Sequence, residues 1–213
     1  MSINQDLLLE FGRLALVYVH LIACCIALGL VLTSDVAMLR ALLQDDPSSR
    51  RKKAQNLHEL QKVVYFALVA LWATGAAIVT LDALVKGGWG YFANPKIQAK
   101  ILVVFLLTVN GVLLHSVVLP WMEKAGSLLN LSFRQTIISV VAGVISGVSW
   151  LYAAFMGVGR PLAWKYSLVE LMAAWPMLVM GGFTGMLLLV TWCKYRNEEG
   201  SPAHFGSLAG ARA

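Results

Sequence analysis

Two basic side chains, Lys100 and His115, share one face of a predicted membrane-spanning helix within the stretch 91–121. Lys100 stands at the start of an apolar run, and His115 lies inside it. At about 100° per residue, Lys100, Thr108, Gly111 and His115 fall within a sector of roughly 80°. Because lipid offers an imidazole no hydrogen-bond partner, this face must meet protein or a cavity. We expect His115 to bind a cofactor or metal and Lys100 to meet an anionic group at the membrane surface.

A second polar stripe follows one face of the first apolar span, centred on His20. Its ends are charged, with Arg13 and Asp35 expected near opposite ends of the span. Ionisable groups within a membrane are costly and mark functional sites, which favours a cofactor or metal ligand at His20, or a proton relay. A hydrogen bond between helices is the structural alternative. The stripe comprises Arg13, His20, Cys24, Ser34 and Asp35.

The apolar residues come in long runs, and the helices that these runs form must position the polar side chains. The chain has 213 residues, of which 59% are hydrophobic and 13% are charged, about half the charged share of an ordinary soluble domain. Runs of about 20 apolar residues match the thickness of a bilayer. We therefore predict an all-α, polytopic membrane protein, with one five-helix transmembrane domain over 1–197 and a loose C-terminal tail over 198–213. The predicted spans are about 12–38, 63–85, 99–121, 135–157 and 167–193.

The basic residues predict the orientation of this bundle. Eleven of the 17 lysines and arginines lie in the first and third linkers and the C-terminal tail. Because basic residues are enriched on the cytoplasmic side, the N-terminus is expected outside and the C-terminus inside. The same pattern favours the bacterial inner membrane, with the lipid bilayer rather than nucleic acid as the partner of the positive charge.

Small residues at four-residue spacing predict close helix packing in the last two spans. Such residues let helix backbones approach each other in a membrane. The contacts are expected within the bundle, with a second copy of the chain, or with a membrane partner subunit. The residues are Ser139, Gly143 and Gly147 in the fourth span and Gly181 and Gly185 in the fifth.

His20 and His115 are not expected to bind one iron from two sides. Both spans run in the same direction, but His115 lies further from the start of its span than His20 does. At about 1.5 Å per residue, their depths differ by about 12 Å. A single histidine ligand, or a relay with His20 near the outer face and His115 near the inner face, fits this separation.

The first three spans resemble a group of small bacterial inner-membrane proteins. The group includes the copper-resistance D family and the membrane-bound J-type protoporphyrinogen oxidase. The resemblance implies haem b, with His20, Lys100 and His115 in the cofactor and substrate roles. The spacing from Lys100 to His115 is longer than in the oxidase family, and the resemblance does not extend to the last two spans. The residues that carry the resemblance are His20, Gly29, Ser34, Asp35, Leu39 and Arg40, then Asn94, Pro95, Lys100 and His115.

Three functions follow as hypotheses. The first is binding of haem b or a related tetrapyrrole in a redox or electron-transfer role. The second is a non-catalytic membrane subunit or assembly factor, because the sequence contains no HExxH, Walker or nucleophile-elbow motif. The third is transport of copper or protons along the first-span stripe.

Overall fold

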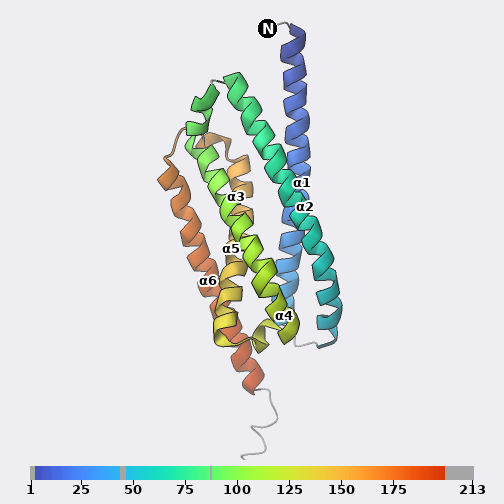
Figure 1. The fold of residues 1–213 in the computed structure, drawn as a ribbon. Helices are drawn as coiled ribbons and strands as arrows, with labels where there is room; N and C mark the ends of the chain where they lie inside the picture. Colours follow the sequence, from blue (N-terminus) through green and yellow to red (C-terminus); the bar gives the residue numbers. More distant parts are fainter. Residues whose placement is uncertain (1–2, 44–46, 87, 200–213) are drawn as a thin grey trace, which may run out of the picture.

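Long helices make up the bundle, which a computed structural model describes over residues 3–43, 47–86 and 88–199 (Figure 1). No strand is assigned within these ranges. Five segments of the described chain are long and apolar enough to cross a membrane, which confirms the predicted all-α class and the five spans. Residues 200–213 of the predicted tail lie outside the described residues. The five segments are Leu7–Arg40, Lys62–Val85, Pro95–Ala125, Phe133–Val158 and Leu168–Arg196.

The first two helices, α1 (Ile3–Leu43) and α2 (Pro47–Lys86), pack side by side and run in opposite directions (Figure 1). They contain 41 and 40 residues. At about 1.5 Å per residue each is about 60 Å long, roughly twice the hydrocarbon thickness of a bilayer. In Figure 1 the start of α1 extends beyond the ends of the other helices. Position along α1 therefore does not by itself give depth in the bundle.

A short turn leads from α2 into the helix that carries Lys100. It consists of the 3₁₀ segment η1 (Gly88–Ala93), and α3 (Pro95–Leu113) follows. The Asn94 side chain accepts a hydrogen bond from the backbone N–H of Lys96 at 3.0 Å. Pro95 occupies the first turn, where its missing N–H leaves no helical bond unmade. These two residues fix the start of α3 and hence the position of Lys100, one turn further on.

The third span contains a π-helical turn, η2 (Leu114–Val118), between α3 and α4 (Leu119–Ala125). Pro120 has no N–H to donate, and its ring crowds the carbonyl four residues earlier. The N–H of Leu119 bonds to the carbonyl of Leu114, five residues back, which widens the turn. The span ends at Gly126, whose positive φ of 69° suits a residue without a side chain.

The last two helices, α5 (Phe133–Val158) and α6 (Leu168–Glu199), complete the bundle. α5 lies inside it and packs against α1, α3 and α6. A capping box between Ser132 and Gln135 fixes its start. Fully buried side chains on α3 and α5, including Val103, Ser149 and Met156, form part of the core. The start of α1 and the end of α6 lie at opposite ends of the bundle (Figure 1).

Candidate functional site

The imidazole of His20 on α1 contacts the neighbouring helix α2. Its Nδ1 lies 2.8 Å from the hydroxyl oxygen of Thr74. The Thr74 hydroxyl donates its one proton to the backbone carbonyl of Ala70 at 2.6 Å. It must therefore accept from His20, so Nδ1 carries the imidazole proton. In the neutral ring, Nε2 then carries a lone pair, which is the form that binds a metal.

The same ring lies beside Gly75 of α2. A Cβ at this position would lie 3.5 Å from Cε1 of His20, at ordinary van der Waals distance. The imidazole edge therefore packs directly over the backbone of α2. None of the described residues makes a hydrogen bond to Nε2 of His20.

Lys100 of α3 lies in the same region of the bundle as His20. Its side chain is half-buried and makes no hydrogen bond or ion pair with the described residues. Its ammonium lies near the ionisable side chains of His20 and Cys24 on α1. The structure thus joins one residue of the stretch 91–121 to the middle of the α1 stripe.

Two polar contacts hold α3 against its neighbours. Trp72 of α2 donates from Nε1 to the hydroxyl of Thr108 at 3.0 Å. Asn110 is buried and donates from Nδ2 to the carbonyl of Ala142 on α5 at 2.9 Å. These bonds fix the rotation of α3, and so direct Lys100 toward α1.

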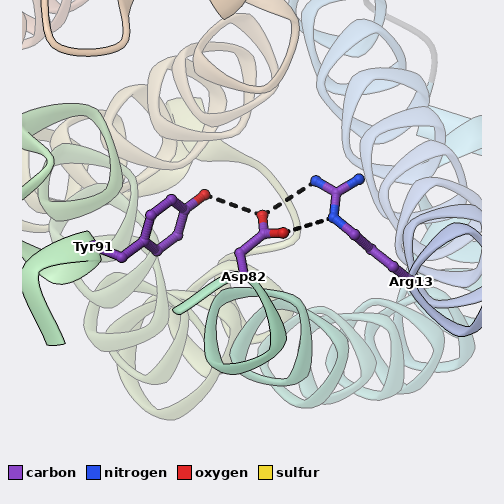
Figure 2. A network of polar contacts seen from close by, with 3 residues as sticks. All are labelled: Arg13, Asp82 and Tyr91. Carbon is purple, nitrogen blue, oxygen red and sulfur yellow. Dashed lines mark hydrogen bonds and ion pairs between the residues drawn. The ribbon is translucent and has the colours of Figure 1, made fainter. Parts of the chain in front are cut away.

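Arg13, at one end of the α1 stripe, belongs to a separate network of polar contacts (Figure 2). Its Nε donates to Oδ1 of Asp82 on α2 at 2.6 Å, and its Nη2 donates to Oδ2 at 3.1 Å. The hydroxyl of Tyr91 in η1 donates to Oδ2 at 3.0 Å. Burial raises the pKa of Tyr91, and the hydrogen bond and negative charge of Asp82 raise it further. Tyr91 therefore remains a donor well above neutral pH.

Asp35 lies deeper in the bundle than the sequence indicates. Its Oδ2 would be 3.2 Å from a Cβ placed on Gly147. Gly147 follows the start of α5 by 14 residues and precedes its end by 11. Asp35 therefore faces the middle of α5 rather than lying at the end of a span. The expectation failed because α1 is much longer than the bilayer, so the sequence could not show which part is central.

His115 lies apart from the His20 region. It follows Lys100 by 15 residues, which corresponds to about 22 Å along an α-helix. It falls in the π-helical turn, and its side chain is exposed. The polar face expected from an ideal helix is buried or half-buried from Lys100 to Gly111, but not at His115. His115 as a ligand stays a prediction.

The remaining stripe residues do not form a metal cluster with their neighbours. Cys24 and Ser34 are half-buried. In the described part of the chain, no three histidine, cysteine, aspartate or glutamate side chains are grouped so as to hold a metal ion. The stripe instead divides among several contacts on α2, α3 and α5.

The predicted packing residues have different surroundings. Gly147 contacts Asp35, whereas a Cβ on Gly143, Gly181 or Gly185 would meet nothing within 4 Å. Ser139 is buried, and its hydroxyl has no hydrogen-bond partner among the described residues. The close approach of α5 and α6 instead involves Gly182, where a Cβ would lie 2.9 Å from Cγ1 of Val144.

Thr74, Gly75, Tyr91 and Gly182 were not singled out from the sequence. Thr74 is a hydroxyl residue in an apolar span beside a glycine, a pattern that could have indicated a polar contact. Asp82 lies near the end of α2, where its carboxylate accepts the bond from Tyr91 of the following turn. Its pairing with Arg13 depends on how α1 and α2 are aligned.

Comparison with family models, curated proteins and solved structures finds no match to this chain. The resemblance to the copper-resistance D and J-type oxidase group therefore stays a prediction. The class that the fold defines is an all-helical protein with five helices, among the described residues, long and apolar enough to cross a membrane.

Proposed function

We propose that this chain is a multi-pass protein of the bacterial inner membrane that binds haem b or a related tetrapyrrole in a redox or electron-transfer role. The observation that carries the proposal is the hydrogen-bond chain from His20 through Thr74 to the Ala70 carbonyl. It places the proton on Nδ1 and leaves Nε2 as a free base. Metal-binding histidines are commonly held in this way by a hydrogen bond from the other ring nitrogen.

Lys100 supplies the second element of a tetrapyrrole site. A half-buried ammonium with no hydrogen bond or ion pair among the described residues favours a nearby anion. Haem carries carboxylates on its propionate side chains, and Lys100 lies near His20. One imidazole and one cation suit haem, because a histidine could hold its iron without a three-residue metal cluster.

Each residue has a defined task in this proposal. Haem would supply a one-electron redox couple at its iron. His20 would bind the iron through Nε2, while Thr74 orients the ring and fixes its tautomer. Lys100 would hold a carboxylate at the edge of the macrocycle. We further propose that the N-terminus lies outside and the C-terminus in the cytoplasm, from the distribution of basic residues.

The absorption spectrum of the purified, detergent-solubilised protein tests the proposal. We expect a Soret band, directly or after haem is added, and its loss in His20→Ala. Thr74→Val should weaken haem affinity about 10- to 100-fold, because Nδ1 loses its acceptor. His115→Ala serves as the matched control and should keep the band. A wild-type protein without a Soret band after haem addition, or a band lost only in His115→Ala, would contradict the assignment to His20.

The second candidate function is that of a membrane subunit, and the exposed glycines of α6 favour it. Gly181 and Gly185 are exposed, and no other part of the described chain covers them. Small residues at this spacing suit contact with another helix. Gly181→Leu should then lower the mass of the detergent-solubilised complex measured by light scattering. Met177→Leu, at an exposed position on the same helix, should leave the mass unchanged. A monomeric wild-type protein that keeps its cofactor would count against this role.

A further inference from the structure

The carboxyl of Asp35 lies against α5 at Gly147. A Cβ at Gly147 would approach Oδ2 to 3.2 Å, closer than most carbon contacts in proteins. One turn earlier, at Gly143, a Cβ would meet nothing within 4 Å. The two glycines therefore differ in function, because only the absence of a side chain at Gly147 lets the carboxyl sit where it does.

Asp35 has no polar partner among the described side chains and backbone groups. It makes no hydrogen bond and no ion pair there. Asp82 is the contrasting case, since it is buried but receives bonds from Arg13 and Tyr91. Both carboxyls lie in segments apolar enough to cross a membrane. An ionised carboxylate in such surroundings is strongly disfavoured unless it is paired.

Among the described side chains, no charged group of the helices packed against α1 makes a hydrogen bond or ion pair with Asp35. On α2, the described titratable side chains before Asp82 are Lys62 and Tyr65, and both are exposed. On α5, Tyr152 donates its hydroxyl to the carbonyl of Leu171. The other titratable groups on the same half of α1 and on α5 lie at least five residues along their own helix from Asp35 or Gly147, and α6 carries the rest. They are Cys24, Cys25 and Arg40 on α1, Arg134 on α5, and Glu170, Cys193, Lys194, Tyr195 and Arg196 on α6.

A single carboxyl such as that of Asp35 suits a proton better than a metal ion. A metal cation such as Ca²⁺ takes six or more oxygen ligands and even Mg²⁺ requires a near-octahedral set. No second carboxylate joins Asp35 in a group that could hold a metal, within the described residues. A proton needs only one oxygen. The side chain is half-buried, so protein does not enclose it completely.

We propose that Asp35 is a proton-binding site at the middle of the bundle, for which Gly147 provides the space. In the membrane, Asp35 carries its proton as the neutral acid and releases it as pH rises. Asp82 stays ionised, because Arg13 and Tyr91 stabilise its negative charge. This site is independent of His20 and of any tetrapyrrole.

Labelling with dicyclohexylcarbodiimide tests the proposal, because this apolar reagent modifies protonated carboxyls within membranes. The full chain in vesicles is labelled and its peptides are analysed by mass spectrometry. We expect an adduct on Asp35 and none on Asp82, and less adduct on raising the pH from about 5 to about 9. Asp35→Asn should lose the adduct. An unlabelled Asp35 across this range, or equal labelling of Asp82, would overturn the proposal.

Two further measurements separate the alternatives. Protection of Asp35 by Na⁺ at constant pH, with no effect of pH itself, would mean a cation site and would overturn a proton site. Gly147→Ala should lower the labelled fraction, because the carboxyl must move, whereas Gly143→Ala should not. Equal labelling of the two alanine variants would overturn the role of Gly147. The infrared band of a protonated carboxyl, lost in Asp35→Asn, gives a readout that needs no reagent.

Discussion

Replacing Arg13 by alanine is expected to destabilise the bundle by about 3 kcal/mol, because it removes the guanidinium that pairs with the buried Asp82 carboxylate. The Asp82 side chain is 6% exposed, whereas the Arg13 side chain is 43% exposed. Without Arg13, the Asp82 carboxylate loses two hydrogen bonds from a cation, while the bond from Tyr91 stays. The same variant also removes the link between α1 and α2 shown in Figure 2.

Replacing Asp82, the partner of Arg13, should destabilise the bundle less. In Asp82→Asn the neutral amide is cheaper to bury, and the half-exposed Arg13 can turn toward water or lipid headgroups. We expect a loss of about 1 kcal/mol, near the net value of a hydrogen bond. The double variant Arg13→Ala/Asp82→Asn should be more stable than Arg13→Ala alone. Unfolding by sodium dodecyl sulfate in mixed micelles measures all three, and equal losses for the two single variants would contradict the stranded-charge explanation.

The length and hydropathy of the apolar runs were enough to predict the five helices. Each run is long enough to cross a bilayer, and in lipid a helix satisfies its own backbone hydrogen bonds. How one helix is aligned along another cannot be predicted from these runs. Arg13 and Asp82 are 69 residues apart in sequence, and nothing local relates their depths. For the same reason, Asp35 was expected at a span end instead of opposite Gly147.

The candidate site could be predicted in part. His20 and Lys100 stand out because ionisable side chains are rare in apolar spans. Their proximity depends on the packing of three helices, which single-helix periodicity does not contain. The tautomer of His20 depends on Thr74 and on the carbonyl to which Thr74 donates. At His115, the helical periodicity failed to predict burial: the side chain is exposed where α3 passes into the π-helical turn.

Gly182→Ala is expected to destabilise the protein by about 2 kcal/mol through overpacking between α5 and α6. The added Cβ would lie 2.9 Å from Cγ1 of Val144, well inside contact distance. Valine is branched at Cβ and stiff at χ1, so it cannot rotate away without a shift of the backbone. The two helices must therefore separate, which weakens the contacts that Val144 makes with the surrounding core.

The neighbouring glycine provides a matched control for this prediction. Gly181→Ala meets nothing within 4 Å and should be neutral or stabilising by up to about 1 kcal/mol, because alanine favours the helix over glycine. Val144→Ala should remove most of the penalty of Gly182→Ala when the two are combined, since the obstructing Cγ1 is gone. Thermal unfolding in detergent compares the variants. Equal stability of Gly181→Ala and Gly182→Ala would show that α6 does not present Gly182 to α5. The regular four-residue spacing of Gly181 and Gly185 would then be the better guide to where this helix packs.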